Sequence, residues 1–498
     1  MQNFTKFLFS EFKIKAGLLI AVTVVFYGFL INNLNLWSDE IYSVLMAKDS
    51  LNDMWTLLIN EDSKPPLYYL YLKGILALFP EQYEIWAAHF ASALLLIIAQ
   101  LFAATAVKKD YGDKTALWLI WLLMVMPASL WLAFEVRTYM LSGLLLMMAS
   151  VYGLRLLDKP KTKDFVLFGI VSLLALYSHY YCALWLMFFY AGILFFMIRD
   201  KKFKANGPAF LLTALGVAIL FAPWLWVPFN SGENISRDWY VNSDFVKLSW
   251  QFWTNPLQPE IYQSSFFIAT TLSASVFSFI LLIGLFNPMT KKIYRAFVLC
   301  FGAVIAVYAL LIIFSYTFRP MVTARYLKIF APVLYLAGAY TLAQYKILKK
   351  AFALISALGF IFTYADIHAI SFDNGYQNLV HDIRHFVPKE QPLIAFDNSN
   401  LFCEYYLPEY HCLLNLGETG EYFRLPQMGK NIDLYKNSAE QPMLALSLYT
   451  YRDNDKCMTY HSNYRYGQNM NLCHYNAEES KIMLSGALSN LLKRLKRY

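Results

Sequence analysis

Eleven long apolar runs, each close to the length at which a helix crosses a bilayer, constrain this sequence more than any other feature. They occupy residues 16–36, 86–107, 115–134, 138–157, 164–180, 181–198, 208–229, 264–286, 296–315, 327–345 and 351–368. Only 15% of the residues are charged, whereas an average globular chain has about 25%. The sequence therefore predicts an all-α polytopic membrane protein with about eleven transmembrane helices.

Lys and Arg residues gather in alternate loops between these runs. Twenty lie before the first run and after the second, fourth, sixth, eighth and tenth, whereas the opposite short loops hold eight. The positive-inside rule places the first set in the cytoplasm. We expect a multi-pass protein of the cell inner (plasma) membrane, with a cytoplasmic N-terminus and a periplasmic C-terminal domain. Residues 1–36 also fit a signal peptide, but without a convincing small-residue cleavage site they are interpreted as a retained first helix.

Two domains are expected from the change in composition along the chain. Residues 1–368 form the transmembrane module, whose first periplasmic loop spans residues 37–85. Within that loop, Pro65–Phe79 is predicted to be a short helix at the membrane interface that starts at a proline pair. A further exterior segment, 230–263, is rich in Trp, Tyr, Asn and Pro, and residues 369–498 are polar and tyrosine-rich.

The tail alternates between helical and strand-like segments, which predicts a small C-terminal extracytoplasmic α/β domain. Residues 378–386 are predicted to be helical, and residues 392–396, 412–415 and 443–448 are predicted to be strands.

The tail also holds four of the six cysteines, and outside the cytoplasm an even number suggests disulfides. Cys403–Cys412 with Cys457–Cys473 is the local pairing among three. Buried free thiols are the alternative, and the irregular spacing disfavours zinc.

Polar residues collect at the predicted outer boundary of the membrane, starting with the acidic pair in Trp37-Ser38-Asp39-Glu40. Carboxylates at such a boundary are costly to dehydrate and therefore form a candidate functional site. In the structural alternative, Ser38 is a helix N-cap and both acids occupy the first helical turn. Later segments add Lys64, Tyr69, Arg137, Tyr139, His179, Arg319, Arg325 and Tyr326. A few cations beside a carboxylate suit an anionic lipid phosphate and a hydroxyl nucleophile.

In this arrangement the chain resembles the bacterial GT-C glycosyltransferases related to protein O-mannosyltransferases and lipid A aminoarabinose transferases. The resemblance rests on Trp37-Ser38-Asp39-Glu40, on Lys64-Pro65-Pro66-Leu67-Tyr68-Tyr69, and on residues 134–139, 177–181 and 323–327. It covers about residues 30–345. It implies a polyprenyl-phosphate sugar donor, an envelope lipid, glycan or protein as acceptor, and inversion at the anomeric carbon. Lipopolysaccharide modification is among the processes that it implies.

The resemblance also implies residue roles. Asp39 would be the general base on the acceptor hydroxyl, and Glu40 would orient it or the sugar. Lys64, Arg325 and Arg137 would hold the donor phosphate. The sugar or acceptor pocket would be lined by Tyr69, Tyr139, His179 and Tyr326.

Structural alternatives remain open for several of these residues. Lys64 would snorkel from an interfacial helix. Arg137 would pair with Glu135 or Asp39. His179 would be an interfacial hydrogen-bonding residue.

No cofactor is assigned from the sequence. Related enzymes often have His or Glu just before the Lys-Pro-Pro run, where it can serve a metal, but this chain has Ser63, a poor ligand. A divalent metal with Asp62 as a ligand stays open.

Two classes of function remain after these observations. One is the glycosyltransferase; the other is a transporter or flippase for a lipid-linked sugar. Transporters usually place polar sites near the bilayer midplane, whereas here the charges gather at one face, which favours the enzyme. We expect membrane lipids as partners and no nucleic acid, because zinc-finger spacings, Walker loops and dinucleotide fingerprints are missing.

Overall fold

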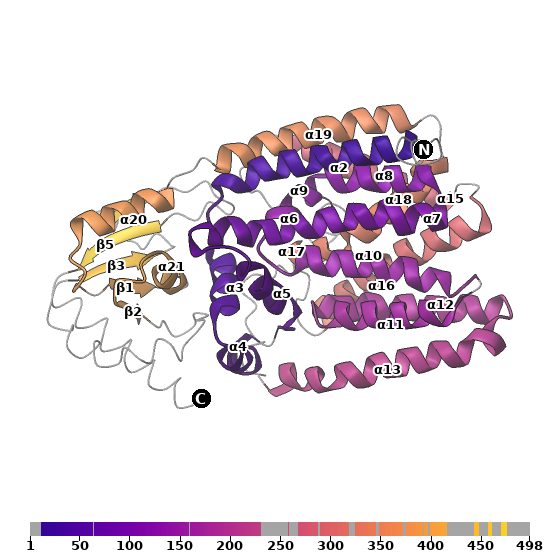
Figure 1. Ribbon diagram of the computed structural model, residues 1–498, viewed down its shortest axis with the longest axis horizontal. Coiled ribbons are helices and arrows are strands. Elements are labelled where there is room, and N and C mark those ends of the chain that lie inside the picture. The colour runs from indigo at the N-terminus through magenta and orange to yellow at the C-terminus, as the bar shows by residue number, and fades with distance from the viewer. Residues whose placement is uncertain are drawn as a thin grey trace, which may run out of the picture. The chain divides into compact units, whose positions relative to one another are not determined.

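The computed structural model describes residues 11–62, 64–158, 160–230, 257, 267–286, 289–317, 324–344, 348–371, 375–391, 393–396, 399–415, 443–447, 457–460 and 470–475. The chain divides into two compact units (Figure 1). Residues 1–32, 64–260 and 264–367 form the first, here called the helical unit. Residues 33–63, 261–263 and 368–498 form the second, here called the tail unit. Most of the predicted exterior segment 230–263 lies outside the described residues.

Each of the eleven predicted apolar ranges contains helix, which confirms the mostly helical fold. The helical unit comprises α2 (Glu11–Leu30), α5 (Leu67–Leu76), α6 (Glu84–Phe102), α7 (Lys108–Tyr111), α8 (Asp113–Val125), α9 (Pro127–Phe134), α10 (Tyr139–Arg155), α11 (Thr162–Leu176), α12 (Tyr180–Arg199), α13 (Phe203–Asn230), α15 (Phe267–Phe286), α16 (Lys291–Thr317), α17 (Ala324–Leu327), α18 (Ala331–Gln344) and most of α19 (Leu348–Ser371). Helices α2, α6 and α8 contact one another, as do α6 and α10 (Figure 1). The helix predicted to start at the proline pair is α5, with Pro66 as its N-cap.

One predicted span is not a single helix. The range 115–134 is divided into α8 and α9, which meet at an angle of 67°. Pro127 is the first residue of α9, and Met126 before it has an extended backbone with ψ of 135°. Proline disfavours the helical conformation in the residue that precedes it, and it lacks the N–H that would continue the ladder of α8. The apolar composition of this range therefore concealed a sharp bend.

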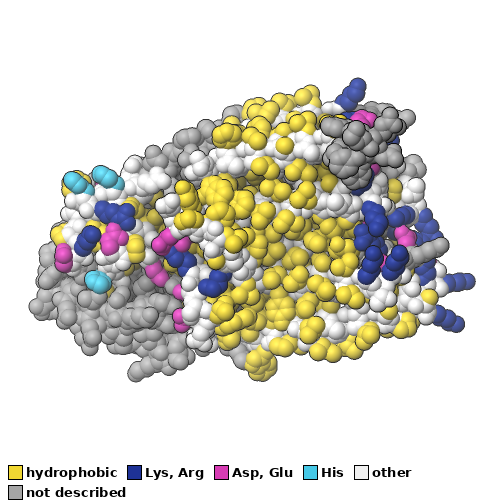
Figure 2. All heavy atoms as spheres, in the orientation of Figure 1, with side chains coloured by type: hydrophobic (Ala, Val, Ile, Leu, Met, Phe, Trp, Pro, Cys, Tyr) yellow, Lys and Arg dark blue, Asp and Glu magenta, His cyan; other side chains and the backbone are white. Residues whose placement is uncertain are grey.

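The surface of the helical unit fits a lipid environment. Six helices in the described residues are long and apolar enough to cross a membrane, or seven if α8 and α9 count as one span. Figure 2 shows hydrophobic side chains gathered over the middle of this unit, with Lys and Arg at one end. Phe29, Leu212 and Trp226 are 71%, 70% and 67% exposed, which water would disfavour. The protein is therefore a multi-pass membrane protein, while the count of eleven spans stays a prediction.

Ion pairs join the loops between several of these helices. Arg155 contacts Asp110 at 2.6 Å and Asp164 at 3.7 Å, so it links the ends of α7, α10 and α11. Arg295 of α16 pairs with Asp200, just after α12. All of these side chains are at most 20% exposed. Because ion pairs gain more where water is partly excluded, these contacts fix the loops relative to one another.

The core of the helical unit is built around α18, whose residues Ala331–Ala343 are all buried. Helix α10 approaches it closely at Gly143. A Cβ atom at this position would lie 2.7 Å from Pro332 Cγ and 3.0 Å from the Ile329 carbonyl oxygen. Only glycine leaves room for this approach. It brings the first turn of α10, with Tyr139, towards the segment 325–330.

The tail unit contains a five-stranded sheet in the order β2-β1-β3-β5-β4. Strand β1 (Leu393–Phe396) is parallel to β2 (Cys412–Asn415) and β3 (Met443–Ser447), while β5 (Met470–Tyr475) is antiparallel to β3 and β4 (Cys457–Tyr460). Helix α21 (Ser399–Tyr406) packs on β1 and β2, and α20 (Gly375–Phe386) contacts β4. The predicted α/β tail domain is confirmed, including its first three strands.

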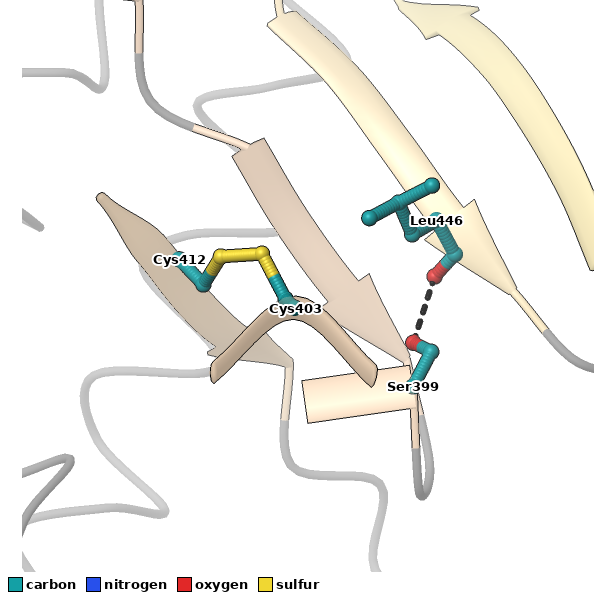
Figure 3. Close-up of a disulfide and its surroundings, with 4 residues drawn as sticks. All are labelled: Ser399, Cys403, Cys412 and Leu446. Carbon is teal, nitrogen blue, oxygen red and sulfur yellow. Dashed lines mark hydrogen bonds between the residues drawn. A yellow bond between two sulfur atoms is a disulfide. The ribbon is translucent and has the colours of Figure 1, made fainter. Parts of the chain in front are cut away.

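The cysteines of the tail follow the local pairing where the structure describes them. Cys403 and Cys412 form a disulfide (Figure 3). Cys473 is also disulfide-bonded, and in the register of β4 and β5 it lies opposite Cys457. Cys182 and Cys300 are free and buried in the helical unit, as expected of packing residues.

Part of the predicted first loop groups with the tail and not with the membrane module to which the sequence assigned it. Residues 33–63 contain α3 (Ser38–Lys48), α4 (Leu51–Leu57) and a π-helical turn, Leu58–Asp62. Helix α3 packs against α21. Buried apolar residues of α3, among them Ile41, Val44 and Met46, account for this grouping.

Candidate functional site

The acidic pair lies in the first turn of α3, in the tail unit. Trp37, with an extended backbone, is the N-cap, and its N–H donates to Glu40 Oε2 at 3.3 Å. The predicted alternative of Ser38 as N-cap is therefore wrong, although both acids occupy the turn that it named. Glu40 is fully buried, whereas Asp39 is partly exposed. The pair is thus divided: one carboxylate caps the helix and the other reaches the surface of its unit.

The Lys64-Pro-Pro segment belongs to the helical unit and is tied to a distant loop. The N–H of Leu67, the first residue of α5, donates to the carbonyl oxygen of Tyr177 at 3.0 Å. Tyr69 of α5 is buried, and Tyr71 donates to the Ala91 carbonyl oxygen in α6 at 2.7 Å. Because prolines restrict the backbone here, these hydrogen bonds also fix the position of Lys64.

The same loop, residues 177–179, is bonded to the start of α10. Thr138 Oγ1 donates to the Ser178 carbonyl oxygen at 2.8 Å, and the hydroxyls of Ser142 and Ser178 are 2.9 Å apart. Arg137, just before this turn, is only 6% exposed, and its N–H donates to the Glu135 carbonyl oxygen. Three segments far apart in the sequence therefore meet: 64–69, 137–142 and 177–181.

Four aromatic rings form a compact group at this meeting point, here called the aromatic cluster: Tyr139, His179, Tyr181 and Tyr326. The ring of Tyr326 lies 5.0 Å from His179, 5.5 Å from Tyr181 and 6.1 Å from Tyr139, centroid to centroid. Tyr139 and His179 are 6.2 Å apart. Three predicted pocket residues, from separate motifs, are thus brought together. Tyrosine rings with polar tips suit a sugar, which has apolar and hydroxyl faces.

His179 is held as a neutral ring within this cluster. Burial lowers the pKa of His179 to about 3, and the nearby cations Lys64 and Arg137 lower it further. Its Nδ1 accepts from the N–H of Tyr181 at 3.1 Å and caps α12, so the single ring proton belongs on Nε2. His179 is therefore a hydrogen-bond donor at neutral pH and not an acid. Lys64 and Arg137 therefore both lie close enough to His179 to affect the pKa of its ring.

Arg325 and Tyr326 belong to the short helix α17, and both are partly exposed. The next turn, Lys328–Phe330, carries a residue that the sequence reasoning missed. Lys328 is fully buried, and its ammonium lies 5.3 Å from the centre of the Trp131 ring. Trp131 in turn stacks on Tyr139 with centroids 5.5 Å apart. The place of Lys328 three residues after Arg325, at the start of an apolar run, is the sequence signal that could have found it.

Ser63, the residue before the Lys-Pro-Pro run, and the candidate Arg319 fall outside the described residues. Among the residues that the structure describes, no group of three or more His, Cys, Asp or Glu side chains is placed to hold a metal ion.

Known proteins resemble the chain in sequence pattern and in fold. The family model described as dolichyl-phosphate-mannose-protein mannosyltransferase matches residues 63–227. Two crystal structures of ArnT from Cupriavidus metallidurans, one apo and one bound to undecaprenyl phosphate, match with TM-scores of 0.61 and 0.60. Each is 13% identical to this chain in sequence, and the match covers 92% of this chain and 97% of the ArnT chain.

A more distant match is the apo oligosaccharyltransferase of Archaeoglobus fulgidus, with a TM-score of 0.50 and 13% identity, covering 87% of this chain and 69% of that chain. No curated protein sequence matches the chain. At such low identity these structures establish the fold alone, and the matched segment contains the Lys-Pro-Pro motif, Arg137, Tyr139 and His179. Residues 63–227 thus match the mannosyltransferase family model and the chain shares the fold of ArnT, which bears out the resemblance drawn from its sequence.

Proposed function

We propose that this protein transfers one monosaccharide from a polyprenyl-phosphate donor to an envelope lipid, glycan or protein, with inversion at the anomeric carbon. The reaction would take place on the outer face of the inner membrane, with the N-terminus cytoplasmic and the tail periplasmic. The observation that carries the proposal is the aromatic cluster with Lys64 and Arg137 beside it. Cations next to a group of aromatic side chains suit a phosphate-linked sugar better than either part alone.

The chemistry follows from the residue types. Asp39, a partly exposed carboxylate, takes the proton from the acceptor hydroxyl. The hydroxyl oxygen attacks the anomeric carbon while the bond from that carbon to the phosphate oxygen breaks. Polyprenyl phosphate leaves with the bonding electrons. Lys64, Arg325 and Arg137 offset the negative charge that grows on it.

Binding and orientation fall to the remaining residues. Glu40 fixes the turn that carries Asp39 through its bond to the Trp37 N–H. Tyr69, Tyr139, His179 and Tyr326 would line the pocket for the sugar or acceptor. The neutral His179, with its proton on Nε2, donates a hydrogen bond without bringing a further positive charge.

The test uses purified protein in nanodiscs with a panel of radiolabelled sugars on synthetic polyprenyl phosphates and an extracted envelope fraction. Label in the acceptor, with the anomeric configuration opposite to that of the donor, is the expected result. A transporter or flippase would bind the donor and move it between leaflets of proteoliposomes without transferring label. Retention of configuration would contradict the single-step displacement.

A further inference from the structure

A phenol group of the tail is hydrogen-bonded to the backbone that leads into the acidic turn. Tyr406, the last residue of α21, accepts a hydrogen bond from the Leu36 N–H at 2.9 Å, and its hydroxyl donates to the Leu36 carbonyl oxygen at 3.4 Å. Both polar groups of Leu36 are therefore engaged by one side chain from 370 positions further along the chain. Leu36 is fully buried. A second bond reinforces the contact, from Gln377 Nε2 to Asn35 Oδ1 at 3.1 Å.

Leu36 lies directly before Trp37, the N-cap residue of α3. The Trp37 N–H donates to Glu40, and the chain then turns into α3 with Asp39 in its first turn. A shift of Leu36 would therefore move the N-cap and the turn together. Glu40 also acts on Tyr406. Burial raises the pKa of the Tyr406 phenol, and the negative charge of the nearby Glu40 carboxylate raises it further.

Helix α21 is itself fixed to the sheet at several points. The Cys403–Cys412 disulfide joins it to β2, and Ser399 Oγ donates to the Leu446 carbonyl oxygen of β3 at 2.8 Å (Figure 3). Arg384 of α20 donates to the Tyr406 carbonyl oxygen at 3.1 Å. The ring of Phe402 lies 4.9 Å from that of Tyr406. Tyr406 is thus carried by a helix that is firmly held to the sheet.

We infer that Tyr406 is a positioning residue for the Asp39 turn, and that the tail serves to hold this turn in place for transfer. This inference rests on the proposed function, in which Asp39 is the base. It assigns the tail a part in the chemical step and not only in acceptor binding. Misplacing a catalytic group by about 1 Å can cost on the order of 100-fold in rate, so loss of one of the two contacts to residues 35–36 should have a measurable effect.

The experiment compares Tyr406→Phe with wild type by two readouts. Phenylalanine keeps the ring contacts and removes only the hydroxyl. Hydrogen exchange followed by mass spectrometry should show faster exchange in a peptide covering residues 34–42, because the Leu36 N–H loses its acceptor. The transfer assay should show kcat lowered about 10-fold with KM for the donor unchanged, since Asp39 is misplaced and the donor-binding residues are untouched.

Tyr410→Phe is the matched control. Tyr410 is a buried tyrosine of the same unit, and its hydroxyl donates to the carbonyl oxygens of Ile383 and Val387 at 3.2 and 3.0 Å. Its loss should lower stability without changing kcat or exchange in residues 34–42. Equal loss of kcat in both variants would overturn the inference, because it would reflect general destabilisation of the tail. Wild-type kcat or wild-type exchange in Tyr406→Phe would also overturn it.

The two readouts separate this inference from the proposed function. If wild type transfers no sugar from any donor while Tyr406→Phe still loosens residues 34–42, the proposed function fails and the structural role of Tyr406 stands. If wild type transfers sugar and the variant does so at the same kcat, the positioning role fails and the proposed function stands.

Discussion

The backbone N–H of Leu67 donates a hydrogen bond to the carbonyl oxygen of Tyr177 at 3.0 Å. This bond joins the start of the Lys64-Pro-Pro helix to the loop that carries His179. Two motifs separated by more than one hundred residues are thereby held in register. It keeps Lys64 close to His179, whose ring pKa is lowered by burial and further by this ammonium group.

Replacing Lys64 with Gln should weaken donor binding. If Lys64 holds the phosphate, the variant loses a charge-assisted contact of about 1.5–3 kcal/mol, which corresponds to roughly 10- to 150-fold in affinity. Binding of a polyprenyl phosphate to purified protein measures this directly. Lys73→Gln, in the last turn of helix α5 that follows Lys64, is the control and should bind as wild type does. Equal affinity of both variants would favour the alternative in which Lys64 only snorkels to the interface.

The pKa of His179 leads to a prediction about stability. The group has an ordinary pKa of 6.5 and a folded-state pKa of about 3. Between these values the unfolded chain binds a proton that the folded chain does not. The contribution of the neutral His179 to the free energy of unfolding is therefore fully present above pH 6.5 and is lost progressively as the pH falls towards 3.

In a thermal unfolding series from about pH 7 to 4.5, His179→Gln should lose less stability than wild type. His385→Gln, at an exposed position on α20, should follow the wild-type curve. A His179 variant with the same slope as wild type would show that the ring titrates normally.

Gly143 permits the close contact between α10 and α18, so even alanine should be costly there. The added Cβ would meet Pro332 Cγ at 2.7 Å and the Ile329 carbonyl oxygen at 3.0 Å. Overpacking of this kind costs about 1–3 kcal/mol. Gly302→Ala is the control, because nothing lies within 4 Å of a Cβ at that position. We expect a lower melting temperature for Gly143→Ala alone, and unchanged melting of both variants would argue against the tight approach.

The Arg155 ion pairs should matter more than the exposed pair near the N-terminus. Arg155→Met leaves Asp110 and Asp164, 14% and 9% exposed, without that cation. Breaking a fully buried pair costs about 3–5 kcal/mol, and this partly exposed one should cost less but remain measurable. Lys15→Met, which breaks an exposed pair with Glu11, should have an effect of about 0–1 kcal/mol. Similar melting temperatures for the two variants would contradict this difference.

The sequence predicted much of the fold because hydrophobic length and loop charge are local signals. Every apolar run contains helix, and strands β1, β2 and β3 lie where apolar stretches predicted them. The bend at Pro127 was missed, because the run that contains it is apolar throughout. Strands β4 and β5 were missed because polar residues interrupt their apolar ones, and they are defined by pairing, β5 with β3 and β4 with β5, rather than by their own pattern.

The candidate site was predictable residue by residue but not in its contacts. Tyr139, His179 and Tyr326 each stood in a recognisable segment, and the fold brings their rings together. Lys328 and Trp131 were not named, because their contact depends on how segments distant in the sequence pack together. The bond of Tyr406 to Leu36 spans 370 positions, and no local pattern signals it.

The division between Asp39 and Glu40 allows the most direct test of the central claim, that Asp39 is the base in sugar transfer. The measurement is transfer of radiolabelled sugar from a polyprenyl-phosphate donor by wild type, Asp39→Asn and the control Asp53→Asn, which changes an exposed acid of α4 in the same unit. We predict that Asp39→Asn loses a factor of about 100–10,000 in kcat while it binds donor normally, and that Asp53→Asn keeps full activity. Wild-type transfer by Asp39→Asn would contradict the account.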